Sequence, residues 1–423
     1  MSATDLSPIP PAADKADLWS EVKRLRKERA LPATIPLLER LCADHPDDLR
    51  FLTSLAEAFI STEREPEART WLDRARKLDP EDPRIAELTA KADAKWPSAE
   101  SLAALEAPRA ELKRTLESFA RRGQHEPLIS AYHAAVREHP EVVANIEDWA
   151  PEVNAAGRAI YRQNDERPSP RAQEVIREVY ERGIAQLSFD EFVGEPALIA
   201  ELQAVVRATG DWTVPGKPHF FKAVREDEVS TSHPILRMAL HPTILEVVNG
   251  FYGLHARLVS ANIVQTRIDA SQGRRRRSSE GWHRDPEDTP VLKCFIYLND
   301  VLEIGHGPFQ YVPASRPGGK YEHLLSRFGR GVYDKTYKTR PDWDQVEREV
   351  AAEDIVTMLG KAGTMFFCNT SGFHRGGYCL TQDRYMCANV YQRPGSQFPS
   401  YMKPDLEVGD DAPLAVRMAA RQP

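Results

Sequence analysis

The sequence is poor in cysteine and has no long apolar run. Its 423 residues include five cysteines, and none stand in CxxC spacing, which argues against a disulfide framework and for reduced thiols. No segment approaches the roughly 18 consecutive apolar residues of a membrane helix. The N-terminus lacks the basic and apolar regions of a secretory signal. We therefore expect a cytoplasmic location and no membrane partner.

An excess of positive charge is also missing. The net charge is -7, which gives no overall attraction to nucleic acid, so we expect no nucleic-acid partner. Charged residues make up 28% and apolar residues 41% of the chain, an ordinary composition for a globular protein. At about 150 residues per domain, the length indicates two or three domains.

The N-terminal third contains a repeat. Pro46 and Pro80 lie 34 positions apart, and each follows a helical pattern and precedes acidic turn residues. A period of this length indicates paired helices that stack. The offsets resemble those of tetratricopeptide repeats, with a plain α-helical bundle as the alternative. The expected packing residues are Leu18, Leu25, Leu38 and Leu41 in the first copy, Leu52, Leu55, Ala56, Phe59, Ala68, Leu72 and Ala75 in the second, and Leu112, Phe119, Leu128, Tyr132 and Ala135 in a further copy ending at Pro140.

The later part of the chain changes from helical to β-type patterns. Helical patterns continue to about residue 208 and return at 234–253, and short apolar runs separated by Gly, Pro and Asp follow. Strands of this length and spacing predict a sandwich or barrel. The expected strands lie within "ARLVSANIVQTRI", "VLKCFIYLND", "GPFQYVPAS", "AGTMFFCNT" and "RYMCANVYQR".

A His-x-Asp pair occurs twice in the chain. His45 and Asp47 lie in a turn between repeat helices, where we expect solvated surface residues. His283 and Asp285 lie beside an apolar strand, where residues i and i+2 project to the same face and can converge on one ion. The second pair is therefore the candidate metal clamp.

His374 offers a third ligand, because it follows an apolar strand and a Gly-containing turn in "FFCNTSGFHRGGYCL". Two imidazoles and one carboxylate, with the opposite face open, form the facial triad of non-heme Fe(II) oxygenases. Arg384, ten residues later, shares a strand face with Met386, Ala388 and Val390. An arginine on an apolar face is costly unless it meets an anion. A dicarboxylate that chelates the metal and reaches Arg384 would satisfy both sites.

These motifs stand in one order: "GWHRDPED", "YLNDVLEIGHGPFQYVPASRPG", "GTMFFCNTSGFHRGG" and then Arg384. Together, over about residues 183–395, they resemble the phytanoyl-CoA dioxygenase family of Fe(II)- and 2-oxoglutarate-dependent oxygenases. The resemblance implies a double-stranded β-helix, or jelly roll, with His283, Asp285 and His374 as iron ligands and Arg384 as the 2-oxoglutarate anchor. Asp285 speaks against halogenation, since related halogenases resemble this pattern with a small residue there.

Two positions depart from the family pattern. The chain has Pro313-Ala314-Ser315-Arg316 where the family often has Pro-Gly-Ser-His, and His306 stands where Asn is more usual. His306 is either a pocket residue or a turn histidine, and we favour the turn. Both departures concern the substrate side of the site more than the metal.

Further residues are candidates for the co-substrate or substrate. Arg375 directly follows a proposed ligand and competes with Arg384 as the anchor, although the family pattern favours Arg384. Lys293, Gln265 and Asn369 lie near the expected pocket. The Arg274–Arg277 run is either a lid for an anionic substrate or a solvated loop.

The sequence thus predicts an α+β protein with a tetratricopeptide-like helical region followed by a jelly-roll domain with flanking helices. The predicted activity is hydroxylation of a C-H bond with release of succinate and CO2. Two alternatives remain: an interaction scaffold with a catalytically silent jelly roll, and a cupin-like metal isomerase or hydrolase. The substrate is a small molecule, a peptide or a carrier-bound group, and the repeats either bind a protein partner, self-associate or buttress the barrel.

The expected domain organisation follows from these patterns. The turn-rich stretch "NDERPSPRA" at 164–172 suggests the boundary between the two regions. We expect a disordered N-terminus at 1–14, the repeat region at 15–163, a linker and connecting helix at 164–182, the oxygenase domain at 183–400 and a C-terminal tail at 401–423.

Overall fold

The computed structural model describes most of the chain and divides into two compact units. Unit 1 comprises residues 1–108 and unit 2 residues 109–423, and each has its own hydrophobic core. The Arg274–Arg277 run and residues 1–13 of the expected disordered N-terminus lie outside the described residues. The structure describes residues 14–27, 31–139, 141–143, 149–164, 166–209, 220–222, 230–268, 278–285, 288, 290–313, 315, 319–327, 345–396 and 406–420.

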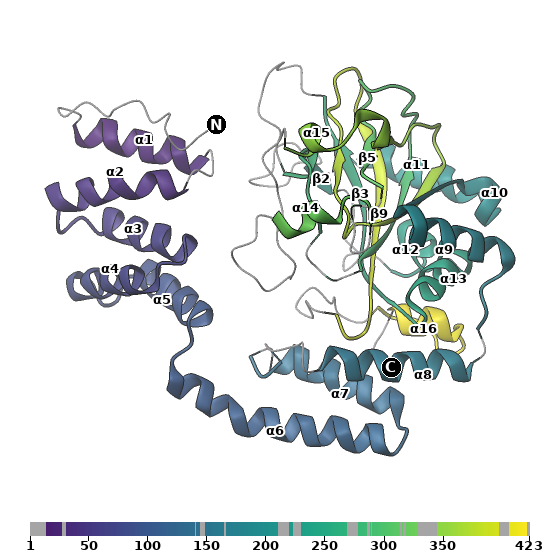
Figure 1. Ribbon diagram of the computed structural model, residues 1–423, viewed down its shortest axis with the longest axis horizontal. Helices are drawn as coiled ribbons and strands as arrows, with labels where there is room; N and C mark the ends of the chain where they lie inside the picture. Colours follow the sequence, from purple (N-terminus) through teal and green to yellow (C-terminus); the bar gives the residue numbers. More distant parts are fainter. Residues whose placement is uncertain are drawn as a thin grey trace. The chain divides into compact units, whose positions relative to one another are not determined.

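Unit 1 is a stack of helices in which each packs against its neighbour in sequence (Figure 1). The acidic residues of the two repeat turns begin the next helices. Asp48 accepts a hydrogen bond from the amide of Arg50 at the start of α3, and Asp82 caps α5 in the same way, which satisfies amides that a helix leaves unpaired at its first turn. The helices are α1 (Lys15–Lys27), α2 (Leu31–Asp44), α3 (Leu49–Ser61), α4 (Glu65–Leu78) and α5 (Pro83–Lys95).

The residues that the repeat pattern predicts for the first two copies all lie in the core of unit 1. Leu38 and Leu41 of the first copy are fully buried, as are Leu52 and Leu55 of the second. The other expected residues of these copies are at most 4% exposed. The prediction of stacked helical repeats is therefore confirmed for this unit.

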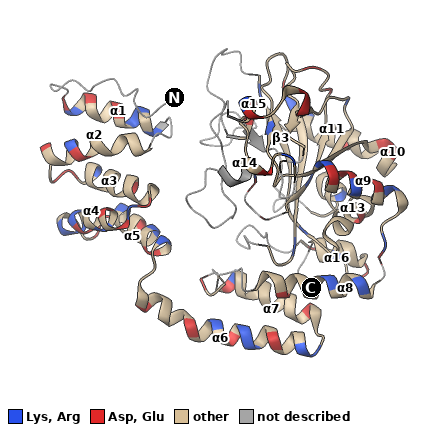
Figure 2. Ribbon diagram, in the orientation of Figure 1, with Lys and Arg blue, Asp and Glu red and all other residues tan. Residues whose placement is uncertain are grey.

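Charged side chains of both signs mix on the helices of unit 1 (Figure 2). Several ion pairs link different helices. Arg69 pairs with Asp93, and Arg84 pairs with Glu57 at 2.7 Å between nitrogen and oxygen. Exposed pairs of this kind contribute little to stability. Acidic and basic side chains therefore alternate over these helices, and no helix of this group carries charge of one sign alone.

The division between the units falls inside a long helix, α6 (Ala99–Arg121). Beyond it, α7 (His125–Glu138) packs against α8 (Ala150–Gln163). Two buried contacts tie this pair to the β-rich region: His133 Nε2 donates to the Pro394 carbonyl at 2.9 Å, and Asn154 exchanges two hydrogen bonds with Gly395. The sequence suggested a boundary at 164–172, whereas these contacts place α7 and α8 within unit 2.

Unit 2 contains two antiparallel sheets. All five expected strand segments form strands, and of the expected sandwich or barrel the two sheets with a core between them correspond to a sandwich. The larger sheet has the order β1 (Ile184–Ser188), β7 (Thr364–Asn369), β4 (Leu292–Tyr297), β9 (Arg384–Gln392), β3 (Arg257–Thr266) and β2 (Phe220–Lys222), and the smaller sheet has the order β6 (Val356–Thr357), β5 (Phe309–Tyr311) and β8 (His374–Gly376).

The strands of the larger sheet alternate between two cores. On β4, Phe295 and Tyr297 pack with Phe309 of the smaller sheet, while Cys294 and Ile296 pack with the helices. On β9, Met386 belongs to the core between the sheets. Because residues two apart share a face, Arg384 and Lys293 lie on the inner faces of their strands.

Helices cover the outer face of the larger sheet (Figure 1). Residues 414–420, expected within a C-terminal tail, instead form a helix that buries Met418, Ala419 and Ala420. Its apolar residues join the same core as those of α13 and β3. The covering helices are α9 (Pro170–Arg182), α10 (Phe189–Val193), α11 (Pro196–Ala208), α12 (Pro234–Ala239), α13 (Pro242–Tyr252) and α16 (Leu414–Ala420).

Short helices lie near the smaller sheet. A third core cluster joins Trp282 and Phe373 to Leu324 and Val346 from two of them. The short helices are η2 (Ser278–Glu280), α14 (Glu322–Arg327), α15 (Gln345–Glu349) and η3 (Ala352–Asp354).

Within the described residues, no helix is both long and apolar enough to span a bilayer.

Candidate metal centre

The candidate metal clamp, here taken as His283, Asp285 and His374, is assembled by backbone hydrogen bonds that bring its two histidines together. The amide of His283 donates to the carbonyl of His374 at 3.0 Å, and the amide of His374 donates to the carbonyl of His283 at 2.9 Å. Asp285 is held beside them, because its amide donates to the Thr370 carbonyl at 2.9 Å. Strand-like pairing therefore places residues 91 positions apart in sequence, 283 and 374, next to each other.

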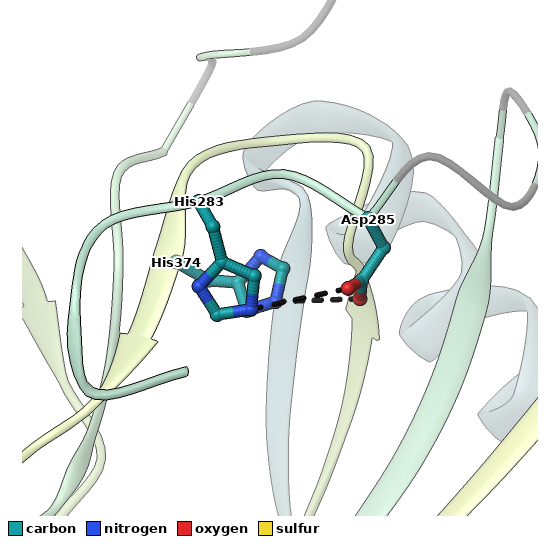
Figure 3. A group of neighbouring side chains, drawn as sticks. All are labelled: His283, Asp285 and His374. Atoms are coloured by element: carbon teal, nitrogen blue, oxygen red, sulfur yellow. Dashed lines mark ion pairs between the residues drawn. The ribbon is translucent and has the colours of Figure 1, made fainter. Parts of the chain in front are cut away.

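The three side chains converge on one point (Figure 3). One ligand atom of each lies within 4.8 Å of the others, and all three residues are buried. Asp285 Oδ2 lies 3.3 Å from His374 Nε2, and Asp285 Oδ1 lies 3.9 Å from His283 Nε2. No other group of three such ligands occurs among the residues that the structure describes.

Each imidazole is oriented by the glycine two residues before it. His283 Nδ1 lies 2.8 Å from the Gly281 carbonyl, and His374 Nδ1 lies 2.9 Å from the Gly372 carbonyl. A carbonyl only accepts hydrogen bonds, so each Nδ1 carries the proton and donates it. The Nε2 lone pairs then face the common point, as in metal sites whose histidines are fixed by a backbone partner.

The electrostatics of the clamp favour an ionised carboxylate. Burial acts to raise the pKa of Asp285, but the Lys293 ammonium and the imidazoles of His374 and His283 hold that pKa well below its ordinary range. An ionised Asp285 would therefore offer an anionic ligand at neutral pH. Two neutral nitrogen donors and one carboxylate suit a borderline divalent ion such as Fe(II).

Arg384 is a buried cation close to the strand that carries His374. It is 2% exposed, donates to the Gly307 carbonyl and donates to Thr266 Oγ1 at 3.0 Å. Its Nε has no hydrogen-bond partner, and the described residues place no carboxylate within ion-pair distance of it. A buried guanidinium without an anion is unfavourable, so this site fits a carboxylate supplied by a ligand.

Gly376 shows how closely this guanidinium approaches the strand that carries His374. A Cβ built on Gly376 would lie 2.9 Å from Arg384 Nη2. Gly376 stands two residues after His374 on β8, where a strand projects side chains to the same face. The glycine leaves room for Arg384 beside the candidate metal ligands.

Arg375 is engaged elsewhere. Its guanidinium stacks on the Trp282 ring at 4.4 Å, forms an ion pair with Glu347 and donates from Nε to Gln310 Oε1 at 2.7 Å. Strand alternation turns it away from the face of His374. These contacts leave Arg384 as the stronger candidate for the co-substrate anchor.

The remaining candidates divide between the two faces. Lys293 lies on the inner face, with its Nζ 2.6 Å from Asp285 Oδ2. Gln265 donates to Asp383 and to the Tyr385 hydroxyl on the outer face. Asn369 ends β7, and its side chain accepts from the amide of Ser371. The structure therefore places Lys293 at the metal clamp and directs the other two side chains to structural contacts.

The positions that depart from the family pattern have structural contacts. His306 Nδ1 accepts from the amide of Leu302 at 3.1 Å, and its Nε2 lies 3.4 Å from Glu303, which supports the turn interpretation. Ser315 is fully buried, and its Oγ accepts from the amide of Phe373 at 2.7 Å, next to His374. Ala314 and Arg316 lie outside the described residues.

Sequence reasoning missed the groups that orient the histidines. "GWH" at 281–283 and "GFH" at 372–374 repeat one pattern, a glycine, an aromatic residue and a ligand. Trp282 and Phe373 are both buried in the same core cluster, which anchors each segment while the glycine carbonyl fixes the imidazole. This repeated triplet is the signal from which the arrangement could have been found.

Two more contacts support the clamp and carried no sequence signal. The ring of Phe309 stacks on that of His374 with centroids 5.6 Å apart. Arg393 forms a two-point ion pair with the fully buried Asp288, with Nε 3.0 Å from Oδ2. The first contact gives the His374 ring an apolar neighbour, and the second holds Asp288, three residues after Asp285.

Comparisons with known proteins concern both units. A tetratricopeptide repeat family model matches residues 25–92, in agreement with the repeats of unit 1. No curated protein matches the sequence of this chain.

Solved structures that are similar to this chain include three with related descriptions. The non-heme α-ketoglutarate-dependent epimerase SnoN from nogalamycin biosynthesis is 21% identical over 52% of this chain and 83% of its own, with a TM-score of 0.39. HygX from Streptomyces hygroscopicus, with nickel, 2-oxoglutarate and hygromycin B bound, is 16% identical over 52% of this chain and 86% of its own, with a TM-score of 0.38. The carbocyclase SnoK from nogalamycin biosynthesis is 21% identical over 56% of this chain and 94% of its own, with a TM-score of 0.35.

Proposed function

We propose that the chain is an Fe(II)- and 2-oxoglutarate-dependent oxygenase that hydroxylates a C-H bond of its substrate. The observation that carries the proposal is the joint placement of two sites. His283, Asp285 and His374 converge within 4.8 Å, and the buried Arg384 stands beside the strand of His374 without a carboxylate partner among the described residues. A candidate metal site next to a guanidinium that has no carboxylate partner among the described residues suits a chelating dicarboxylate.

The residues of the chain have distinct parts in this reaction. His283, Asp285 and His374 would hold the metal from one side, and Arg384 would bind the far carboxylate of 2-oxoglutarate. Iron, O2 and 2-oxoglutarate, when bound, supply the oxidation that converts the co-substrate to succinate and CO2 and inserts oxygen into the C-H bond. Phe309 and the aromatic core behind it exclude water from that side of the ligands.

The proposal is tested by loading the protein with Fe(II) and 2-oxoglutarate without oxygen. We expect the weak visible charge-transfer band of a chelated Fe(II) complex, and succinate formation once oxygen is admitted. Well-folded protein that gives neither the band nor succinate would instead favour a scaffold with a silent jelly roll.

A cupin-like isomerase or hydrolase would use the same metal clamp without a second carboxylate site. Arg384 distinguishes the two functions, because such an enzyme has no need of a buried guanidinium near its metal. Under the oxygenase proposal, turnover requires 2-oxoglutarate and is coupled to succinate release. Turnover of a substrate with no dependence on 2-oxoglutarate would support the isomerase or hydrolase.

The finer assignments belong to the same proposal. We infer that residues 183–395 are a phytanoyl-CoA dioxygenase-like domain, on the motifs quoted from the sequence. The five cysteines are all free and buried, which supports a reducing, cytoplasmic compartment. Unit 1 would recruit a protein partner or a carrier-bound substrate, since stacked helical hairpins form extended binding surfaces.

A further inference from the structure

Lys293 places an ammonium group directly against the metal clamp. It lies on the inner face of β4, paired in register with Cys368 of β7 and Val390 of β9. Its Nζ is 2.6 Å from Asp285 Oδ2, and the two side chains are only 13% and 11% exposed. The pair is therefore largely removed from water, where a charged contact is screened far less than at the surface.

The two oxygens of Asp285 have different surroundings. Oδ2 faces the Lys293 ammonium at 2.6 Å and His374 Nε2 at 3.3 Å, whereas Oδ1 faces His283 Nε2 at 3.9 Å. The contact with Lys293 is an ion pair without hydrogen-bond geometry, so the ammonium attracts Oδ2 through its charge, in buried surroundings where that attraction is weakly screened. Lys293 thus distinguishes two atoms that are chemically equivalent in a free carboxylate.

We propose that Lys293 is a positioning residue that keeps Asp285 a monodentate ligand. Its ammonium would hold Oδ2, so that only Oδ1 binds the metal. This inference rests on the proposed function. A carboxylate that is not restrained in this way can chelate a divalent ion with both oxygens. In an octahedral ion with two histidine ligands, that second oxygen would take the position that remains open once 2-oxoglutarate has chelated.

The ligation mode can be measured without turnover, by counting the water bound to Mn(II). Mn(II) accepts the same nitrogen and oxygen ligands and is paramagnetic, so it speeds the relaxation of the protons of any exchangeable water on it. We expect the Mn(II)-loaded native protein to keep one such water after saturation with 2-oxoglutarate. Lys293→Met, which keeps the length of the side chain and removes the ammonium, is expected to lose it.

Two variants serve as controls for that loss. Lys293→Arg retains a cation that can reach Oδ2 and is expected to keep the water. Lys361→Met makes the same chemical change at an exposed lysine and should behave as native protein. Retention of the water in a folded Lys293→Met protein would overturn the inference, because Asp285 would then bind through one oxygen without help.

Should Lys293→Met not fold, Lys293→Ala with added ethylammonium decides the question. The shorter side chain leaves space for the free cation, and we expect the residual water to be absent at first and to return as the cation is titrated. Relaxation that shows the water before the cation is added would overturn the inference.

The same measurements separate this inference from the proposed function. Native protein that binds neither Mn(II) nor 2-oxoglutarate would overturn the oxygenase assignment, and the role of Lys293 with it. Native protein that binds both, together with a Lys293→Met variant that keeps the water, overturns the role of Lys293 alone.

Discussion

His283 and His374 exchange two backbone hydrogen bonds, of 3.0 and 2.9 Å between nitrogen and oxygen. The pairing sets their Cα positions, and the carbonyls of Gly281 and Gly372 then set their rings. The metal clamp is thus determined mainly by main-chain atoms, which are stiffer than side chains. This leaves Asp285, with its contact to Lys293, as the proposed ligand whose position depends on another side chain.

Arg384→Ala should weaken the binding of 2-oxoglutarate and leave metal binding intact. Hydrogen bonds to a charged group are worth about 1.5 to 3 kcal/mol, so the dissociation constant should rise roughly 10- to 150-fold. Calorimetric titration of the Mn(II)-loaded protein measures both affinities. Arg375→Ala is the matched control: it loses contacts with Glu347 and Trp282 and should reduce stability with little effect on 2-oxoglutarate. The reverse result would assign the anchor to Arg375.

Gly376→Ala should displace the guanidinium of Arg384 without removing it. The new Cβ would lie 2.9 Å from Arg384 Nη2, too close for an undisturbed contact, so we expect a roughly tenfold weaker 2-oxoglutarate affinity, equivalent to about 1.4 kcal/mol. Mn(II) affinity should change little. The measurement is the same titration as for Arg384→Ala.

Gly157→Ala provides the control for an added methyl group. Its Cβ would meet Leu254 at an ordinary distance of 3.6 Å, within the helix α8. Replacing a helical glycine by alanine should stabilise the protein by about 0.5 to 1 kcal/mol. A Gly376→Ala protein that binds 2-oxoglutarate as well as Gly157→Ala does would show that the guanidinium lies elsewhere.

Local patterns in the sequence were sufficient for much of this arrangement. Strand alternation placed Arg384 on the inner face of β9 with Met386, because apolar residues between two sheets repeat every second position. The His283–Asp285 pair was distinguished from His45 and Asp47 by its strand context alone. The inner faces of the strands follow from short-range periodicity, which a sequence records directly, whereas the meeting of His283 and His374 depends on long-range backbone pairing.

Other features depend on contacts that periodicity does not record. A register shift between Leu258 and Ser260 on β3 changes which face each later residue occupies, and Gln265 consequently lies outside the pocket. The connection of α7 and α8 to the β-rich region rests on hydrogen bonds from His133 and Asn154 to residues more than 240 positions away. The short α16 is stabilised by burial against α13 and β3, since an isolated helix of that length is unstable.

The buried His133 should make unit 2 less stable in mild acid. Burial is the main cause that lowers its pKa to about 3, with the charge of Arg257 adding to it, whereas an unfolded histidine has a pKa near 6.5. Between these values only the unfolded chain binds the proton, so stability falls as pH decreases from about 6.5, by up to about 1.4 kcal/mol per pH unit. His133→Gln keeps a donor for the Pro394 carbonyl and removes the titration.

Denaturant unfolding of unit 2 at several pH values between 7 and 4 would measure this effect. We expect a smaller loss of stability with acid in His133→Gln than in the native protein. His139→Gln, at a histidine whose side chain is 63% exposed, serves as the control and should follow the native curve. Equal slopes for all three proteins would contradict a neutral, buried His133.

Truncation should separate the roles of the two units, provided that the cut respects their cores. Removing residues 1–98 deletes the core of α1–α5 and leaves α7 in place, so Mn(II) and 2-oxoglutarate affinity should be unchanged. Removing residues 1–140 also deletes Leu128, Ile129 and Tyr132, which are at most 1% exposed, and takes away the partner of Pro394. We expect that shorter protein to lose stability, because deleting a large buried side chain costs about 2 to 5 kcal/mol. Arg393, near the same loop, would also hold Asp288 less firmly.

Thermal unfolding with and without Mn(II) distinguishes the two truncated proteins. If the protein without residues 1–140 unfolds at the same temperature as the protein without residues 1–98, then α7 does not support the β-rich core. If removal of residues 1–98 alone abolishes metal binding, then unit 1 contributes to the site in a way that its separate core does not explain.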